Sequence, residues 1–342
     1  MSGMRKNFQV WFTELRKVMT TNSDFKYVFG PVPSRRLGRS LGVDLVPFKT
    51  CTYDCIYCQL GRTTKKTIQR QEYVPLDKVL RELRRKLTTC KPDYITLSGS
   101  GEPTLYSPLK ALIRGIKKET AIPLAVLTNG SLLWNRNVQD ALLLADLVIP
   151  SLDAADESMF QYVNRPHASI SFDRMVKGLI DFRSRYSGTL WLEVFLLGGV
   201  TGVAAEVSRI NKIAKRLKPD RIQLNTVTRP PAEEFAFPTP EEQMKRFCRL
   251  FSMKTEFIAA YHGAVGKADI QSNTGDILNL LRRRPCTLKD VASGLSLHPT
   301  QAAKALETLL CNKQISEQRT NGCVYFSIQQ KKKNIIKKRR AK

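Results

Sequence analysis

Three cysteines stand close together in the run Cys51-Thr-Tyr-Asp-Cys55-Ile-Tyr-Cys58, with the spacing C-x3-C-x2-C. Thiolates are the ligands of iron–sulfur clusters, and a cluster that only carries electrons takes four of them. Three thiolates would hold a 4Fe–4S cluster with one iron open to a small molecule. Structural zinc sites are closed by four ligands, and no further Cys or His stands nearby, so the spacing argues against zinc.

Other readings of the three cysteines are inert core thiols or a partial zinc site. Lys49, Thr52 and Asp54 favour a surface loop over a core. Eight cysteines in 342 residues, without a secretory leader, predict a reducing compartment rather than disulfides. The other five are scattered and form no second cluster motif: Cys90, Cys248, Cys286, Cys311 and Cys323.

Around these cysteines the chain resembles the radical S-adenosylmethionine (SAM) superfamily. An aromatic residue, Tyr57, precedes the third cysteine, and Ser98–Thr104 follows the apolar run 94–97. The second segment is similar to the Gly-Gly-Glu motif of the superfamily, with a serine in place of its first glycine. The resemblance implies that Tyr57 lies near the adenine of SAM. It also implies that the methionine amino group is held by Gly99, Ser100, Gly101 and Glu102.

Two further segments fit the same resemblance, which covers about residues 27–250. Asn129 closes a third strand, and Ser151 and Asp153 close a fourth, where they would reach the ribose hydroxyls. The resemblance implies a 4Fe–4S cluster on Cys51, Cys55 and Cys58. One electron from a donor such as flavodoxin or ferredoxin would then cleave SAM, and the resulting 5′-deoxyadenosyl radical would remove a hydrogen atom from the substrate.

Further polar residues follow later strands. Arg165 could clamp a carboxylate of SAM or of the substrate, or form a surface salt bridge. Glu193 lies in the apolar run 190–195 and is expected to face the lumen and meet SAM or substrate, or else to form an outward ion pair. Asn225 and Arg229 could contact adenine or substrate.

The stretch Gly30–Gly42 resembles a branch akin to the wyosine synthases of tRNA. Those enzymes carry further cysteines upstream for a second cluster, whereas this chain has no cysteine before Cys51. We therefore expect a relative with a different or unknown substrate, with a tRNA base as the leading hypothesis. The alternatives are a radical SAM enzyme for a peptide, protein or small metabolite, and a DNA-binding regulator that senses redox state through its cluster.

The formal net charge of the chain is +26. Residues 331–342 hold eight Lys or Arg and no acid, and residues 31–70 hold eight basic and two acidic residues. A basic surface favours a polyanionic partner such as tRNA or another nucleic acid. The alternatives are a disordered, solvated tail and positive charge that serves SAM or a small phosphorylated substrate.

Strand-like and helix-like stretches alternate from about Leu41. Strands are expected at 41–46, 94–98, 123–128, 147–152, 189–197 and 221–227. Helices are expected at 76–87, 107–119, 137–144, 204–217 and 241–251, the last capped by Thr239, with further helix between 152 and 186. The pattern predicts an α/β fold with a partial (β/α)6 barrel over residues 27–254, which the resemblance implies is a radical SAM barrel. Every motif follows a strand, where parallel barrels carry their sites.

A second unit is expected over residues 273–328. Three helical stretches, the second capped by Thr287, precede a hairpin around Asn321-Gly322, as in a winged helix domain. Its third helix would offer His298, Thr300, Gln301 and Lys304 to nucleic acid, although such domains also dock proteins. The remaining ranges are an N-terminal extension (1–26), a linker (255–272) and a basic tail (329–342). With no apolar run of membrane length and no leader, we expect no membrane contact and a cytoplasmic protein.

Overall fold

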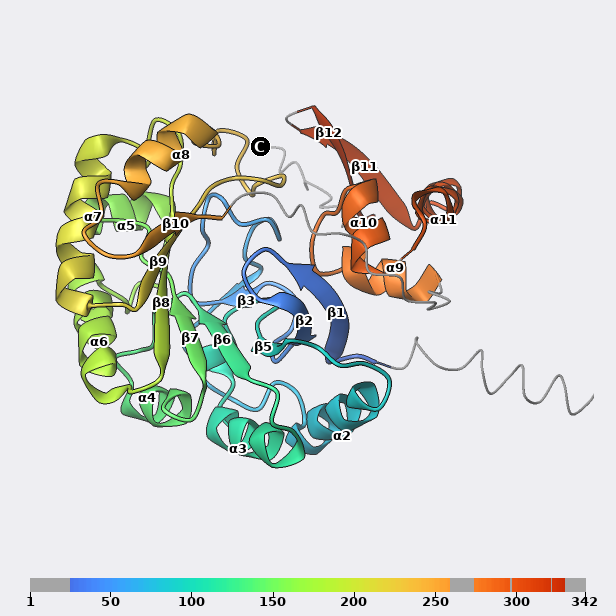
Figure 1. Cartoon of the computed structure of the whole chain (residues 1–342), viewed down its shortest axis with the longest axis horizontal. Helices are drawn as coiled ribbons and strands as arrows, with labels where there is room; N and C mark the ends of the chain where they lie inside the picture. Colours follow the sequence, from blue (N-terminus) through green and yellow to red (C-terminus); the bar gives the residue numbers. More distant parts are fainter. Residues whose placement is uncertain (1–24, 259–273, 296, 321, 330–342) are drawn as a thin grey trace, which may run out of the picture.

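The fold is described from a computed structural model, which describes residues 25–258, 274–295, 297–320 and 322–329 (Figure 1). Nearly all of the expected N-terminal extension, most of the expected linker and nearly all of the basic tail lie outside these residues. Within them, no helix is long and apolar enough to cross a membrane.

The larger unit is built on one eight-stranded sheet with the order β1-β2-β5-β6-β7-β8-β9-β10. Neighbouring strands from β2 to β10 run parallel, and β1 pairs antiparallel with β2. The strands are β1 (Val28–Ser34), β2 (Gly38–Val43), β5 (Tyr94–Leu97), β6 (Leu124–Thr128), β7 (Leu147–Pro150), β8 (Thr189–Phe195), β9 (Arg221–Asn225) and β10 (Thr255–Phe257). The result is a mixed α/β fold with a largely parallel sheet.

Helices cover the outside of this curved sheet, as Figure 1 shows. The helices are α2 (Leu76–Leu87), α3 (Leu109–Glu119), α4 (Arg136–Leu142), α5 (Glu157–Val163), α6 (Phe172–Arg185), α7 (Ala204–Leu217) and α8 (Glu241–Cys248). The bounds expected for α2 and α7 are confirmed, because their apolar residues recur on one helical face. The expected cap of α8 is wrong: Pro240 takes that position without a side-chain bond, and the Thr239 hydroxyl is buried without a partner.

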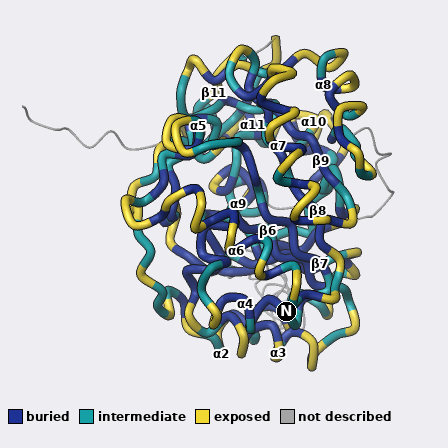
Figure 2. The backbone as a smooth tube through the Cα atoms, turned by 90° about the vertical axis from the view of Figure 1, so that its left-hand side faces the viewer, coloured by how far each residue is buried: buried dark blue, intermediate teal, exposed yellow. Residues whose placement is uncertain are grey.

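The core lies between the sheet and these helices. In Figure 2 the strands and the inner helix faces are buried, whereas the outer helix faces are exposed. Side chains such as Leu83, Leu112 and Phe182 have no exposed surface. Apolar burial of this kind supplies most of the folding free energy and holds the strand ends, which carry the polar motifs, in a fixed relation.

Two strands at the edges of the sheet were not anticipated. β1 and β2 form an antiparallel hairpin over residues 28–43, and β2 spans Gly38–Val43 rather than the expected 41–46. At the other edge, β10 pairs with β9 although its residues fall in the segment expected to be a linker. β10 is only three residues long, too short for a periodic pattern to identify.

The C-terminal unit contains three helices and a hairpin: α9 (Thr274–Leu281), α10 (Leu288–Gly294), α11 (Pro299–Cys311), β11 (Ile315–Thr320) and β12 (Cys323–Ile328). Thr287 caps α10 in a capping box with Asp290, as expected. The unit has its own apolar core, and Val32 of β1 packs against that core. In Figure 1 the unit lies beside β1, at that edge of the sheet.

Candidate active site

The cysteine loop follows the carboxyl end of β2. Within it, β3 (Thr50–Cys51) pairs with β4 (Lys65–Lys66), and Thr50 forms a bridge with Gly101 after β5. The backbone N–H of Ile56 donates to the Val163 carbonyl at 3.0 Å. The loop is therefore bound to the segment after β5 and to the end of α5.

Each of the three cysteine sulfurs lies near one side-chain N–H donor. Asn129 Nδ2 lies 3.5 Å from Cys51 Sγ, and Asn164 Nδ2 lies 3.5 Å from Cys55 Sγ. The third donor is the ammonium of Lys49, 3.6 Å from the Sγ of Cys58. Burial, and then the charge of Glu102, raises the pKa of Cys51 to about 12, and burial raises the pKa of Cys55 well above its usual value.

The expectation that Lys49 and Thr52 mark an open surface loop is wrong. Lys49 is 3% exposed and Thr52 has no exposed surface. Lys49 is buried because its ammonium donates to the Gly61 carbonyl and also lies against the Cys58 sulfur. The Thr52 hydroxyl lies between Ser131 and Asn129. Lys49 therefore lines an internal cavity, and Thr52 is packed in the protein interior.

The segment after β5 lies directly against the cysteine loop. Gly101 packs on the carbonyl of Thr50, and Gly99 adopts a positive φ of 132° beside the Asp44 carboxylate. The backbone N–H of Ser100 donates to that carboxylate at 3.0 Å. Ser100 therefore suits a position where the superfamily has glycine, since its hydroxyl also bonds Asp44.

Glu102 connects the cysteine side of the site to β6. Its buried carboxylate accepts hydrogen bonds from Thr104, from the Thr128 hydroxyl at 2.6 Å and from the Asn129 backbone N–H at 2.8 Å. Burial raises the pKa of Glu102 despite these donors. The residue expected to help hold an amino group therefore also fixes the end of β6.

Asp153 and Tyr57, both expected near the adenosine of SAM, are bonded to each other. The Tyr57 hydroxyl donates to Asp153, and its ring stacks on Phe195 at 3.9 Å. Asp153 also accepts from Asn164 at 2.9 Å and from the Phe195 backbone N–H at 3.0 Å. Burial raises the pKa of Asp153 to about 6. Asp153 is 3% exposed and lies behind the cavity wall, whereas Tyr57 and Ser151 line it.

Arg165 lies next to the cysteine loop, where its carbonyl accepts from the Asp54 backbone N–H at 3.3 Å. Its guanidinium forms an ion pair with Glu233, which also pairs with Arg62. Arg165 has a positive φ of 45° and does not line the cavity. The arrangement is the salt bridge that the sequence left open as the alternative.

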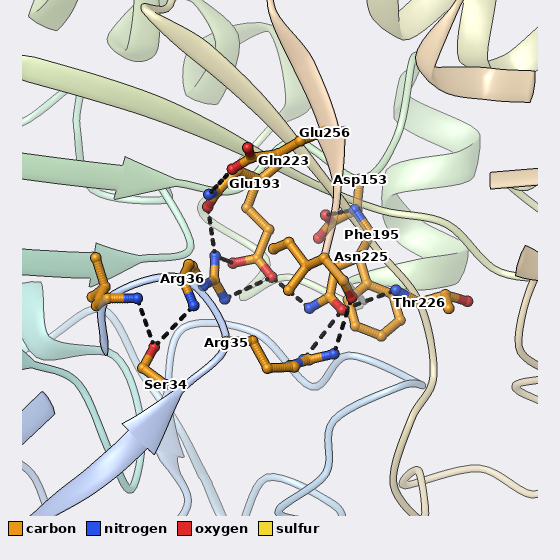
Figure 3. A network of polar contacts seen from close by, with 12 residues as sticks. Ser34, Arg35, Arg36, Asp153, Glu193, Phe195, Gln223, Asn225, Thr226 and Glu256 are labelled. Atoms are coloured by element: carbon orange, nitrogen blue, oxygen red, sulfur yellow. Dashed lines mark hydrogen bonds and ion pairs between the residues drawn. The ribbon is translucent and has the colours of Figure 1, made fainter. Parts of the chain in front are cut away.

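Glu193 of β8 lies inside the curved sheet, as expected, and is held by a residue that sequence reasoning missed (Figure 3). Arg36, in the turn between β1 and β2, donates to both Glu193 oxygens at 2.9 and 3.2 Å. Asn225 Nδ2 donates to Glu193 at 2.8 Å, and Arg35 donates to Asn225 at 3.3 Å. Glu193 and Asn225 were expected from the sequence, whereas the only signal for Arg36 was the Arg35-Arg36 pair itself.

A single cavity of about 650 Å³ joins these groups. Its wall includes thirteen of the fifteen residues expected from the sequence: Cys51, Cys55, Tyr57, Cys58, Gly99, Ser100, Gly101, Glu102, Asn129, Ser151, Glu193, Asn225 and Arg229. Residues of the C-terminal unit line it as well, among them Arg284 and Tyr325. The carboxyl ends of the parallel strands thus converge on one cavity, as a ligand site of such a fold requires.

The donor set suits an iron–sulfur cluster better than one metal ion. No group of His, Cys, Asp or Glu in the described residues is placed to hold a metal ion. In a 4Fe–4S cube each cysteine binds a different iron, so its thiolates need not converge as the ligands of one ion do. Three cysteines on one cavity wall, each sulfur with an N–H donor, fit the cube.

Comparison with known proteins identifies the class. The model of the radical SAM superfamily matches residues 45–227, more than half of the chain, and the chain belongs to this superfamily. Membership implies a 4Fe–4S cluster and SAM, and the protein is a radical SAM enzyme. A radical SAM methyltransferase from Sphaerobacter thermophilus has the same fold with a TM-score of 0.51 and 16% identity, over 64% of this chain and 66% of that one.

Closer relatives are proteins of the UPF0026 family. A UPF0026 protein of Helicobacter pylori is 35% identical over 87% of this chain and 96% of its own length, and UPF0026 protein MJ1312 of Methanocaldococcus jannaschii is 40% identical over 66% and 70%. A Brachyspira hyodysenteriae protein named GTPase Obg is 41% identical over 89% of this chain. The chain spans only 45% of that protein's length, so the activity in that name is not assigned to this chain.

Proposed function

We propose that this radical SAM enzyme modifies RNA, with a tRNA base as its substrate. The observation that carries the radical SAM assignment is that Cys51, Cys55 and Cys58 share one cavity wall with the residues after β5, β6, β7 and β9. The finer assignment to RNA is supported by the net charge of +26 and by the resemblance of Gly30–Gly42 to the wyosine branch. The RNA substrate therefore rests on charge and resemblance.

Cys51, Cys55 and Cys58 would hold the cluster. When bound, and reduced by an external electron donor, the cluster would pass one electron to SAM for its reductive cleavage, which would supply the radical chemistry that removes a hydrogen atom from the substrate. The thiols must lose their protons on binding. Asn129, Asn164 and Lys49 would donate to the ligand sulfurs, and such hydrogen bonds set the potential of a cluster.

SAM would lie between the cysteine loop and the ends of the neighbouring strands. Ser100 and its flanking glycines offer backbone groups to the methionine end, and Ser151 offers a hydroxyl on the same wall. The Tyr57 ring, fixed by Asp153 and by stacking on Phe195, would border the adenine. Glu193 and Asn225 would line the part of the cavity that the substrate enters.

The C-terminal unit would be a winged helix domain that presents RNA to this cavity. The side chains of the N-cap residue His298 and of Thr300, Gln301 and Lys304 on α11 are exposed. His298 and Gln301 also form the capping box of that helix. We further propose a cytoplasmic location and reduction by a flavodoxin or ferredoxin, in keeping with the unpaired cysteines among the described residues.

The test begins with anaerobic reconstitution by iron and sulfide, followed by SAM and dithionite. We expect a brown protein with four irons per chain that releases 5′-deoxyadenosine. Cys55→Ala should lose cluster and cleavage together, whereas Cys311→Ala, an exposed cysteine outside the cavity, should lose neither. An intact cluster that yields no 5′-deoxyadenosine would favour a redox-sensing regulator instead.

The RNA assignment needs a second measurement. Retention of tRNA, duplex DNA and an unrelated peptide is compared at rising salt, because phosphate contacts give binding a steep salt dependence. Preference for tRNA, and a mass change in a tRNA nucleoside after turnover, are the expected results. Indifference to all nucleic acids would overturn the RNA substrate and leave a peptide, protein or small metabolite.

A further inference from the structure

The wall of the cavity has an excess of positive charge. Its wall carries seven cationic side chains, Arg35, Arg36, Lys49, Arg229, Arg283, Arg284 and Lys289, against three carboxylates, Glu102, Glu193 and Asp290. The cations come from both units of the fold, since the last three belong to the C-terminal unit. A cleft lined by one sign of charge concentrates ligands of the opposite sign.

Two of these arginines have partners. Arg36 forms the bidentate pair with Glu193 described above. Arg283 donates to the backbone carbonyls of Asn279 at 2.8 Å and of Lys26 at 3.3 Å, and it lies 3.7 Å from Asp44. Both guanidiniums therefore stabilise the fold through contacts within the protein.

Arg229, just after β9, has weaker partners. Its nearest carboxylate is Asp290 of α10, at 3.7 Å, and its Nη1 donates to Gln59 at 3.3 Å. The side chain is only 12% exposed, and its buried Nε has no hydrogen-bond partner. A buried guanidinium N–H without an acceptor is costly, so an acceptor from a ligand would stabilise it.

Arg35 and Arg284 have no carboxylate partner in the described part of the chain. Arg35 donates to two neutral oxygens, of Asn225 at 3.3 Å and of Ile258 at 3.4 Å. Burial, and then the charges of Arg229, Arg36 and Arg284, lower the pKa of Arg35 to about 10. These guanidiniums are therefore close enough to repel one another.

We propose that Arg35, Arg229 and Arg284 form a subsite for a phosphate-type oxyanion of the substrate. The planar guanidinium fork matches the geometry of such an anion and stays charged when buried. One arginine comes from the β1–β2 turn, one follows β9 and one precedes α10, so the subsite exists only while the C-terminal unit is seated on the larger unit. The inference rests on the proposed function for the chemistry it serves, but the binding of the anion does not depend on a cluster.

Pyrophosphate is the probe, added to the full chain without cluster or SAM, with binding followed by calorimetry. Arg284→Gln should weaken binding about tenfold or more, because a hydrogen bond to a charged group contributes about 1.5–3 kcal/mol. Arg284→Lys keeps the positive charge, so it should lose less affinity for pyrophosphate than Arg284→Gln. Arg282→Gln is the matched control, since Arg282 is exposed two residues away and does not line the cavity.

If Arg282→Gln weakens pyrophosphate binding as much as Arg284→Gln does, the proposed subsite is wrong. It is also wrong if the wild type binds no pyrophosphate. Displacement of pyrophosphate by SAM would also overturn it, because the arginines would then serve the SAM carboxylate. Displacement by tRNA, or instead by a mononucleotide, supports the proposal and identifies the source of the phosphate. If neither displaces the probe, the assignment to a substrate phosphate is wrong. Loss of SAM cleavage with pyrophosphate binding intact would refute the proposed function alone.

Discussion

Gly101 and Thr50 lie so close that a Cβ atom on residue 101 would fall 1.8 Å from the Thr50 carbonyl oxygen. That oxygen accepts the Glu102 backbone N–H at 3.2 Å, so it cannot move away without losing a bond to the same segment. Thr50 immediately precedes Cys51. The glycine therefore sets how closely the cysteine loop approaches the strand end after β5.

Gly101→Ala should displace the cysteine loop. The obstructing atom is backbone, and overpacking of this kind costs about 1–3 kcal/mol. We expect a lower melting temperature and less iron bound per chain after reconstitution. Gly275→Ala is the control, because no heavy atom lies within 4 Å of its added Cβ and alanine suits the α9 helix. A Gly101→Ala protein with full iron content would contradict the role of this contact.

Arg36→Met should destabilise the fold by about 3 kcal/mol, because it leaves the Glu193 carboxylate without its charged partner. The two side chains are 12% and 14% exposed, so water compensates little. The double variant Arg36→Met with Glu193→Met should regain most of the loss, since it removes both charges. Urea unfolding of the two variants and the wild type measures the difference. Equal losses in the single and double variants would show that packing, not the charge, determines the effect.

The ion pair of Arg36 and Glu193 should make the unfolding free energy depend on pH. Burial raises the pKa of Glu193, but the charge and hydrogen bonds of Arg36 outweigh it with the help of Asn225, so the net pKa is lowered. A lowered folded pKa contributes stability above the unfolded value of about 4.3, and that stability is lost as the pH falls through the folded value. The wild type should therefore exceed Glu193→Gln in unfolding free energy at pH 6, and the gap should narrow toward pH 3. If the difference in unfolding free energy between the wild type and Glu193→Gln stays constant from pH 6 to pH 3, the lowered pKa of Glu193 does not contribute to stability.

Local patterns carried most of the information that the sequence offered. The helices α2 and α7 were predicted to the residue because three or four apolar positions per two turns define a helix. The cysteine loop and the segment around Ser100 were predicted as neighbours because each follows a parallel strand, and such strand ends meet at one edge.

Contacts across long sequence distances could not be predicted. Arg36 and Glu193 are 157 residues apart, and nothing in the run that contains the arginine indicates which carboxylate it meets. The partners of Arg165 and Asp153 could not be predicted either: Arg165 pairs with Glu233, and Asp153 bonds Tyr57, so neither side chain lines the cavity. Lys49 was misjudged as a surface residue because its buried acceptors, Gly61 and Cys58, could not be foreseen.

Tyr57→Phe tests whether the bond to Asp153 positions the ring that would border the adenine. The change keeps the stacking on Phe195 but removes one of the three donors to a buried carboxylate. We expect a loss of about 1–3 kcal/mol in unfolding free energy and a weaker affinity for SAM. Tyr73→Phe is the control, because its hydroxyl bonds only the Gln69 carbonyl at the exposed surface. If SAM binds Tyr57→Phe as tightly as wild type while stability falls, the bond holds the fold and plays no part in placing the ring.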